Sequence, residues 1–286
     1  MSSTMAYLGP AGTFSEEVAI RYAAGTTTPL DLEPYPGIDL VIYAVEKNEV
    51  ELGIVPVENS LEGSVNMTLD LLRDCNVKIQ GEILHPVQHF LLAQKGETLS
   101  GIREVYSHPQ ALAQCRRNLA RLLPGVPALA TTSTAEAARL ALQCPGRGVV
   151  ASRHAASIYG LTVLQAHLQD ESGNVTRFLL LSKEDASPTG DDKTSLLLGL
   201  PDRPGSLHSL LGVLVRYGLN ITKIESRPVR GDLGKYIFFL DVQGHRHEEK
   251  VSRAINEARQ ETLFVKLLGS YPRDEMKMKR AEGKRQ

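Results

Sequence analysis

Residues Gly53–Val65 read Gly-Ile-Val-Pro-Val-Glu-Asn-Ser-Leu-Glu-Gly-Ser-Val, and this stretch indicates the class of the fold. Its apolar first part predicts a strand, and the short polar side chains of Glu58–Ser60 follow where that strand ends. Gly63–Ser64 then predicts the start of a helix, because apolar residues recur at helical spacing from Val65 to Leu72. A strand that delivers polar groups beside a helix N-terminus is suited to holding a small anion.

Outward from this stretch, strand-like and helix-like patterns alternate. The apolar runs that predict strands are Met5–Leu8, Leu52–Val57, Val77–Leu84, Val87–Ala93, Glu104–Tyr106 and Gly148–Ala151. Helical periodicity lies between many of them, and the capping-box spellings Thr13–Glu16 and Ser133–Glu136 mark two helix starts. A further helix, with apolar residues from Leu112 to Leu122 on one face, follows Ser107–Gln110. This alternation predicts an α/β domain.

The pattern changes near residue 183. Ser182–Asp192 has no apolar period and predicts a linker. Residues 193–272 then give the order strand, helix, strand, strand, helix, strand, which is the ferredoxin-like βαββαβ pattern. Residues 273–286 carry six basic and three acidic side chains and almost nothing apolar, so we expect a disordered basic tail. The expected organisation is therefore a first domain over 1–183, a second over 193–272, and the tail.

The bulk composition excludes several classes of protein. The chain has 286 residues and a net charge of −1, which argues against a dedicated nucleic-acid surface. The three cysteines are odd in number and lack metal-ligand spacing, so a reducing, cytoplasmic compartment is expected. No apolar run approaches the roughly 20 residues needed to cross a bilayer, and the N-terminus does not resemble a signal peptide. The motifs of nucleotide, metal and serine-hydrolase sites are missing, so we expect no cofactor and no metal.

Three further polar clusters stand at predicted strand ends or helix starts. The hydroxyls of Thr13 and Ser15 can donate to a ligand or simply cap a helix. His108 can be a cap, a surface side chain or a catalyst. Arg177 stands beside an apolar strand, where its planar fork suits either a ligand carboxylate or a carboxylate of the protein itself.

Taken together, these clusters resemble the prephenate dehydratase family with a C-terminal ACT regulatory domain. The matching segments are Tyr7–Ser15, Val55–Ser60, Gly63–Val65, Ser107–Gln110, Ser133–Glu136 and Asn174–Phe178, then Arg203–Leu207, Leu219–Ile221 and Glu225–Pro228. This ordered series covers nearly the whole chain up to the tail and is highly specific. One departure is that the ACT loop of the family usually reads Gly-Ala-Leu, whereas here it reads Gly205-Ser206-Leu207.

The resemblance implies a catalytic domain of two α/β lobes, similar to periplasmic binding proteins, with the substrate in the cleft. It implies conversion of prephenate to phenylpyruvate, water and carbon dioxide, a step of phenylalanine biosynthesis. It also implies that the ACT module binds L-phenylalanine and inhibits the enzyme, usually at a subunit interface, in a homodimer or homotetramer.

The resemblance further implies that the threonine of Thr-Arg-Phe, here Thr176, is the central catalytic residue. Arg177 and Phe178 complete the expected catalytic set, and Glu58 is expected to have a structural or proton-relay role. The expected substrate-binding residues are Thr13, Ser15, Asn59, Ser60, Ser64, His108 and Asn174. The expected phenylalanine-binding residues are Gly205, Ser206, Leu207, Asn220, Glu225, Ser226, Arg227 and Pro228.

Two alternatives stay open from the sequence. Arogenate differs from prephenate by an amino group in place of the side-chain keto group, and the residues do not separate these substrates. A non-catalytic sensor of amino acids or aromatic acids could use the same two-lobed scaffold, because a fold alone does not determine function.

Overall fold

The structure, a computed structural model, describes residues 3–229 and 232–274. These residues form two compact units. The first consists of the residues up to Val77 together with His85–Lys183, and the second of Lys78–Leu84 together with the residues from Glu184 onward. The expected basic tail therefore lies, beyond Asp274, outside the described residues.

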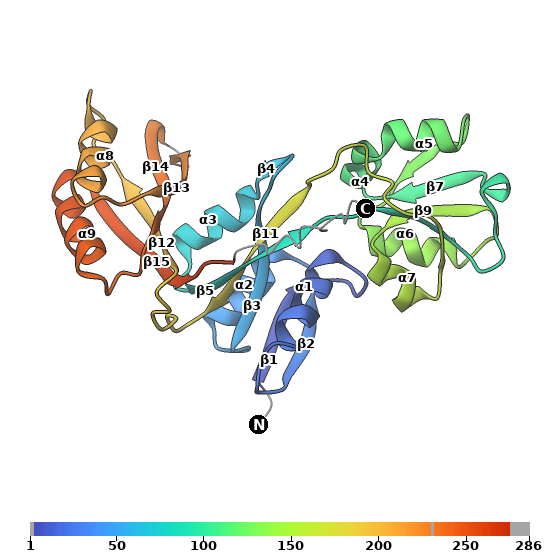
Figure 1. Cartoon of the computed structure of the whole chain (residues 1–286), viewed down its shortest axis with the longest axis horizontal. Coiled ribbons are helices and arrows are strands. Elements are labelled where there is room, and N and C mark those ends of the chain that lie inside the picture. Colours follow the sequence, from blue (N-terminus) through green and yellow to red (C-terminus); the bar gives the residue numbers. More distant parts are fainter. Residues whose placement is uncertain (1–2, 230–231, 275–286) are drawn as a thin grey trace, which may run out of the picture. The chain divides into compact units, whose positions relative to one another are not determined.

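The first unit contains two lobes, each built on its own sheet (Figure 1). In the first lobe β1 pairs in parallel with β2 and β3, and β11 pairs antiparallel with β3. The strands of this sheet include β1 (Ser3–Leu8), β2 (Leu30–Tyr35), β3 (Leu52–Asn59), β4 (Gly63–Ser64) and β11 (Val175–Ser182). The helices of this lobe are α1 (Phe14–Ala23), α2 (Ile38–Glu46) and α3 (Asn66–Asp74). The strand β5 (Lys78–Pro86) follows α3 in the chain.

The sheet of the second lobe has the order β10-β6-β9-β7-β8. Its strands are β6 (Phe90–Ala93), β7 (Glu104–Ser107), β8 (Ala128–Ala130), β9 (Arg147–Ala151) and β10 (Thr162–Gln165). Its helices are the 3-10 turn η1 (Leu99–Gly101), α4 (Pro109–Gln114), α5 (Arg116–Leu122), α6 (Thr134–Ala141) and α7 (Arg153–Tyr159).

Both faces of this second sheet are buried, because neighbouring strand residues enter different core clusters. Leu92 and Val149 pack with alanines of α6 and α7. Leu91 and Val150 pack with residues of α4 and α5 on the other side. Two helix layers therefore cover the sheet, as expected of an α/β lobe.

The second unit has the strand order β13-β14-β12-β15 and the expected βαββαβ connectivity (Figure 1). Its elements are β12 (Asp192–Gly199), α8 (Ser206–Arg216), β13 (Ile221–Val229), β14 (Asp232–Gln243), α9 (Glu249–Glu261) and β15 (Phe264–Pro272). One face of the sheet packs Leu196, Leu198 and Leu240 against Leu210 of α8 and Val251 of α9. The predicted fold class is confirmed in both parts of the chain.

Two local predictions are wrong. Gly63 and Ser64 do not open a helix, because they form β4 opposite Asn59 and Glu58 of β3. The helix begins only at Asn66, and the N–H of Val65 donates to Val57 O at 2.8 Å. The short β4 hairpin thus satisfies the backbone groups that we expected at a helix N-terminus.

The single helix predicted from Leu112 to Leu122 is divided at Cys115 into α4 and α5. The carboxylate of Asp170, far along the chain, accepts hydrogen bonds from the N–H groups of Arg117 and Asn118, each at 2.8 Å. A carboxylate bound to the first N–H groups of a helix stabilises a helix start, so α5 begins anew there.

No helix within residues 3–229 and 232–274 is long and apolar enough to span a membrane.

Candidate active site

The candidate site begins where β3 and β11 lie side by side. In this antiparallel pair Asn59 is opposite Thr176 and Glu58 is opposite Arg177. The buried Asn59 side chain donates from Nδ2 to Thr176 Oγ at 2.9 Å and to Asn174 Oδ1 at 2.6 Å. The two most characteristic segments of the sequence therefore meet directly, although they are far apart in the chain.

The orientation of the Asn59 amide follows from its neighbours. Its Oδ1 accepts hydrogen bonds from the backbone N–H groups of Leu61, at 2.9 Å, and Glu62, at 3.2 Å. A backbone N–H can only donate, so the amide oxygen must face these groups and the nitrogen must face Thr176. Thr176 Oγ is consequently the acceptor in this pair, and its own O–H hydrogen is left to donate elsewhere.

Amide hydrogen bonds continue from Asn59 into the second lobe. Asn174 Nδ2 donates to Gln114 Oε1 at 2.9 Å, and Gln114 Nε2 donates to Glu62 Oε1 at 2.9 Å. The same Gln114 oxygen lies 2.9 Å from His89 Nε2. Gln114 directs its Nε2 toward the Glu62 carboxylate oxygen and therefore its Oε1 toward Asn174. Asn174 then directs its Nδ2 toward Gln114 and its Oδ1 toward Asn59.

His89 is a buried member of this network. Burial lowers its pKa, although the hydrogen bond with Gln114 acts in the opposite direction. The ring is therefore neutral near pH 7, with its hydrogen on Nε2 facing the Gln114 oxygen. Nδ1 is buried and has no hydrogen-bond partner among the described residues.

A cavity of about 650 Å³ opens beside Thr176, and residues of both lobes line it. The first lobe contributes Phe14 and Ser15 from the first turn of α1. The second lobe contributes Ser133 and Thr134 from the start of α6. The first N–H groups of a helix have no partner inside the helix, so these two helix N-termini supply donors for anionic groups from opposite lobes.

The structure brings most of the predicted catalytic and substrate-binding residues together. Those that line the cavity are Thr13, Ser15, Asn59, His108, Asn174, Thr176 and Phe178. Thr13 and His108 also cap helices: Thr13 Oγ accepts from Glu16 N at 3.3 Å, and His108 Nδ1 accepts from Gln110 N at 3.3 Å. For these two residues the capping and the lining roles coexist.

Ser60, Ser64 and Arg177 are not among the lining residues in the described part of the chain. Ser60 Oγ accepts from Val175 N at 3.0 Å and donates to Gly173 O at 3.3 Å, so it joins two backbone segments. Ser64 lies in β4.

Arg177 forms an ion pair with Glu58. Arg177 is 6% exposed, and its Nη1 lies 3.0 Å from Glu58 Oε1. A buried guanidinium requires an anionic partner, and here a carboxylate of the protein provides it. This pair links β11 to β3. The neighbouring residues Asn59 and Thr176 line the cavity instead.

Several lining residues were not predicted from the sequence. His89 and Gln114 are two of them, and Arg139 in the last turn of α6 adds a positive charge. Glu136 also lines the cavity, and its pKa is lowered by hydrogen bonds from the hydroxyl and the backbone N–H of Thr132. Of these residues only Glu136 stood in a segment that the sequence singled out, the capping box Ser133–Glu136.

The second unit has a smaller pocket of about 160 Å³, lined in part by Arg203, Ser206, Leu207, Tyr236 and Phe238. Of the predicted phenylalanine-binding residues, Ser206 and Leu207 therefore line it.

Gly205 precedes α8 with φ +89°, in the left-handed region that favours glycine. Ser226 and Pro228 lie opposite Phe238 and Tyr236 in the β13–β14 pair, whereas Glu225 and Arg227 alternate with them. Asn220 is exposed and accepts from Gln243 N through its backbone oxygen at 2.9 Å.

Among the described residues, no group of three His, Cys, Asp or Glu side chains is placed to hold a metal ion.

Comparison with known proteins agrees with this geometry. A family model described as prephenate dehydratase matches residues 5–186, and a model of the ACT domain matches residues 194–260. A bifunctional chorismate mutase/prephenate dehydratase from Aquifex aeolicus is 43% identical over 269 residues, which cover 94% of this chain and 73% of the relative.

Two solved structures resemble nearly the whole chain. A prephenate dehydratase from Arthrobacter aurescens, in complex with L-Phe, has a TM-score of 0.86 and 33% identity, and the match covers 94% of this chain and 90% of that one. GqqA, described as a novel type of quorum quenching acylase, has a TM-score of 0.84 and 30% identity, and the match covers 95% of this chain and 98% of that one. From the matched family models and this similarity, the chain belongs to the prephenate dehydratase family, with a C-terminal ACT domain.

Proposed function

We propose that this chain converts prephenate to phenylpyruvate, with L-phenylalanine as an inhibitor that binds the ACT domain. The observation that carries the catalytic part is the Thr176 hydroxyl, whose oxygen accepts from Asn59 and whose hydrogen is free to donate into the cavity. The reaction needs such a donor, because the ring hydroxyl of prephenate must leave.

The chemistry requires little beyond geometry and one hydrogen-bond donor. Cleavage of the bond to the ring carboxylate releases carbon dioxide, and its electron pair enters the ring as the C–O bond breaks. The departing hydroxide takes up one proton and leaves as water. A threonine hydroxyl is a weak acid, so Thr176 stabilises the developing charge by hydrogen bonding, and the Asn59 amide strengthens Thr176 as a donor.

Prephenate is a dianion, and the cavity offers matching groups on both sides. The N-terminal turns of α1 and α6 can each bind one carboxylate, and Arg139 adds a full positive charge. Glu136 carries the opposite charge and orients donors rather than binding the substrate. Arg177 is assigned to the protein and not to the substrate, because it is buried against Glu58. Ser60 and Ser64 act by holding the strand ends in place.

The test is phenylpyruvate formation from prephenate by the full chain, with arogenate and an N-acyl amide as parallel substrates. Thr176→Val removes the hydroxyl but keeps a similar volume, and we expect kcat to fall by about 10²–10³-fold, as for loss of one transition-state donor. Thr176→Ser keeps the hydroxyl and is the matched control, with a loss of less than about tenfold.

Near-normal kcat in Thr176→Val would reject the assigned role. Turnover of arogenate but not of prephenate would make arogenate the substrate of the proposed reaction. Turnover of the N-acyl amide alone would favour an acylase. Binding of aromatic acids without any turnover would favour a sensor.

The regulatory part rests on the pocket beside Gly205 and Ser206 and on the sequence of the ACT loop. A ligand shifts activity only if it binds one state of the protein better than another. We expect L-phenylalanine to lower the rate and to raise the melting temperature. A titration with L-phenylalanine that changes neither the rate nor the melting temperature would refute the proposed regulation.

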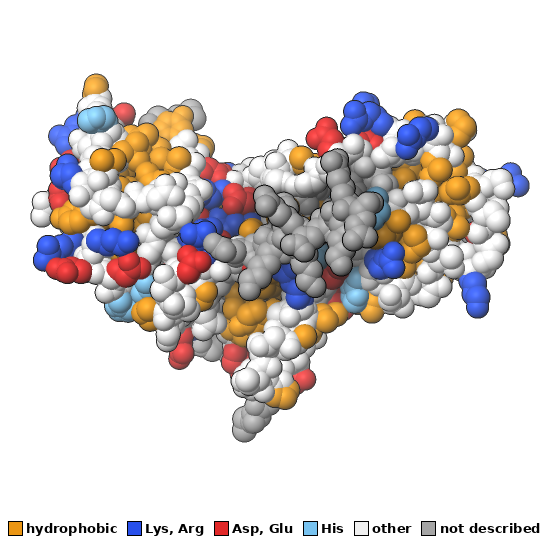
Figure 2. Space-filling view, in the orientation of Figure 1, with side chains coloured by type: hydrophobic (Ala, Val, Ile, Leu, Met, Phe, Trp, Pro, Cys, Tyr) orange, Lys and Arg blue, Asp and Glu red, His pale blue; other side chains and the backbone are white. Residues whose placement is uncertain are grey.

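We also propose a homodimer or homotetramer and a cytoplasmic location. Large hydrophobic side chains are exposed in the second unit, among them Val215 at 76%, Ile224 at 46% and Tyr236 at 49%. Figure 2 shows hydrophobic side chains gathered on its surface near α8 and β14, and such patches favour association. Cys75, Cys115 and Cys144 are all free thiols, in keeping with a reducing compartment.

A further inference from the structure

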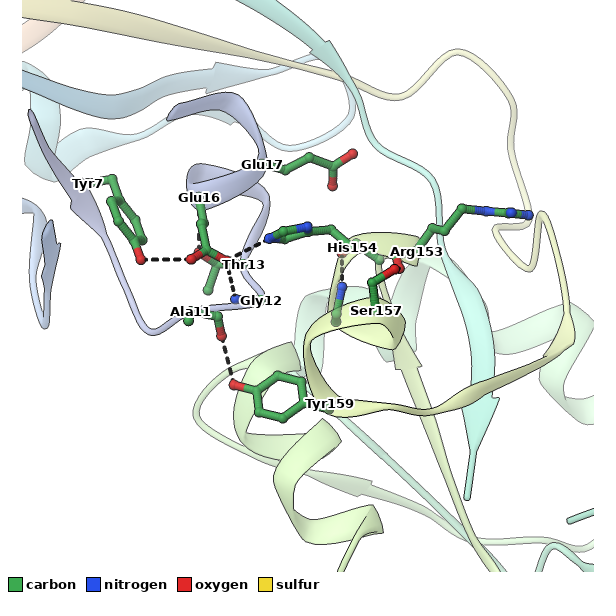
Figure 3. Close-up of polar contacts among 12 residues, drawn as sticks. Tyr7, Ala11, Gly12, Thr13, Glu16, Glu17, Arg153, His154, Ser157 and Tyr159 are labelled. Carbon is green, nitrogen blue, oxygen red and sulfur yellow. Dashed lines mark hydrogen bonds and ion pairs between the residues drawn. The ribbon is translucent and has the colours of Figure 1, made fainter. Parts of the chain in front are cut away.

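Glu16 makes contacts that the proposed reaction does not use. Its carboxylate accepts hydrogen bonds from Tyr7 Oη at 3.0 Å and Gly12 N at 2.6 Å, both in the first lobe. It also lies 2.7 Å from His154 Nε2, on α7 of the second lobe. Figure 3 shows the Glu16 carboxylate at the centre of these three interactions. In an ordinary capping box the glutamate serves only its own helix start, so the contact with His154 is additional.

A second contact joins the same two segments. Tyr159, at the end of α7, donates from its hydroxyl to Ala11 O at 2.8 Å (Figure 3). Its ring lies against Gly12, where an added Cβ would come within 2.7 Å of Cε2. Gly12 also has φ +88°, so both backbone conformation and space require glycine here. The loop before α1 is therefore held against α7 at two points.

This loop is also a wall of the cavity. Gly9, Pro10 and Thr13 line the cavity, whereas Glu16, His154 and Tyr159 do not. The contacts with α7 thus lie outside the cavity and affect it by positioning the loop that lines it.

The electrostatics of Glu16 favour a persistent contact. Burial alone would raise its pKa, but the hydrogen bonds from Gly12, His154 and Tyr7 outweigh burial, and the pKa is lowered. The Glu16 carboxylate is therefore ionised near pH 7. Burial and the nearby carboxylate raise the pKa of Tyr7, so its hydroxyl stays a donor.

We propose that Glu16 is a positioning residue: with His154 and Tyr159 it forms an interlobe latch that holds the cavity in its closed, substrate-binding width. This deepens the proposed function and rests on it for the kinetic readout. A substrate that binds only the closed state has an apparent affinity reduced by the closed fraction. Loss of the latch therefore raises KM, while kcat at saturation stays nearly constant.

Glu16→Ala removes the acceptor from Tyr7, Gly12 and His154 together. We expect KM to rise by about 10–100-fold with kcat within about threefold of the original, as for a closed fraction reduced to a tenth or less. Tyr159→Phe removes only the hydrogen bond to Ala11 and should raise KM by about 2–5-fold.

Glu16→Gln is the conservative variant. Its amide oxygen can accept from Gly12 and His154, while its NH₂ group donates to the Tyr7 oxygen, so KM should stay within about threefold. Ser157→Ala, on the exposed side of α7, is the matched control and should change nothing. A purely structural role for Glu16 gives a different result, because partial unfolding lowers kcat in proportion to the active fraction and leaves KM unchanged.

The lobe separation can be measured without any assay of activity. Cys144, exposed in the second lobe, and a cysteine introduced by Lys47→Cys in the first lobe accept spin labels, while Cys75 and Cys115 are buried. We expect a longer, broader distance distribution in Glu16→Ala than in the parent, Glu16→Gln or Ser157→Ala. An unchanged distribution in Glu16→Ala, or a loss of kcat at constant KM, overturns the proposal.

This design separates the two proposals. If the parent protein does not turn over prephenate, the proposed function fails, and the distance measurement still decides whether the latch exists. If prephenate is turned over but Glu16→Ala leaves both KM and the distance distribution unchanged, the latch proposal is refuted and the proposed function stands.

Discussion

Asn59→Asp tests the direction of the hydrogen bond on which the proposed mechanism depends. The substitution keeps the size of the side chain and an oxygen for the N–H groups of Leu61 and Glu62. It replaces the amide N–H groups that now reach Thr176 at 2.9 Å and Asn174 at 2.6 Å with a carboxylate oxygen. The only favourable response is for Thr176 to donate its own hydrogen to the new carboxylate, which withdraws that hydrogen from the substrate.

The magnitude follows from the loss of one donor to a developing oxyanion, about 2.7–4 kcal/mol, or about 10²–10³ in kcat. The introduced negative charge opposes a dianionic substrate and should raise KM as well. Asn59→Ala leaves the Thr176 hydroxyl free, so it should lose only about 2–13-fold in kcat, as for the net contribution of one neutral hydrogen bond, about 0.5–1.5 kcal/mol.

We expect the free energies of unfolding of the two variants to follow the opposite order to their kcat values, with Asn59→Ala the less stable. The alanine variant leaves the N–H groups of Leu61 and Glu62 without the side-chain acceptor, at a cost of about 1–3 kcal/mol, whereas the aspartate variant keeps it. The assays are kcat for phenylpyruvate formation and the urea midpoint of each purified variant. The reasoning is refuted if Asn59→Asp turns over as fast as Asn59→Ala, or faster.

Two further predictions concern the free energy of unfolding. Burial lowers the pKa of His85 from 6.5 to about 4, so between these pH values the unfolded chain binds a proton that the folded chain does not. The free energy of unfolding therefore falls as the pH drops from 6.5 towards 4, by up to roughly 3 kcal/mol. Urea unfolding of His85→Leu over pH 4–7 should show a correspondingly smaller slope with pH, and parallel slopes for the two proteins would contradict the assignment. Gly53→Ala should destabilise by about 1–3 kcal/mol, because its Cβ would lie 2.7 Å from Val45 Cγ2 and 3.1 Å from Val41 Cγ1. Gly212→Ala, within α8 and with no neighbour of that Cβ closer than 3.7 Å, is the control and should stabilise by about 0.5–1 kcal/mol in the same urea titration.

The elements that the sequence predicted correctly are those whose signal is local. The caps at Thr13 and Ser133 lie where the capping-box spelling puts them, and Pro109 follows the cap at His108. The βαββαβ order was visible because each of its strands and helices has a clear apolar period. Alternation along β11 also explains why Thr176 and Phe178 reach the cavity while Arg177 faces Glu58.

What the sequence did not reveal depends on distant residues. Gln114 reads as an ordinary helix residue, and its role appears only when Asn174 and Glu62 are brought to it. Helix α7 is short and mixed in polarity, so its periodicity is weak, and His154 was not singled out. The break between α4 and α5 requires Asp170, which no local pattern around Cys115 could indicate.

The strand segment Lys78–Leu84 has a consequence for how this protein can be divided. It stands in the middle of the first domain's sequence but belongs to the second compact unit. There Glu82 pairs with Lys193 at 2.8 Å, and the backbone of Ile79 leaves no room for a side chain at Gly269. A gene cut in the linker near residue 183 therefore does not yield two self-sufficient products. An ACT domain transplanted from a relative would have to match a strand that the recipient enzyme keeps, so successful chimaeras should exchange residues 78–84 together with the C-terminal domain.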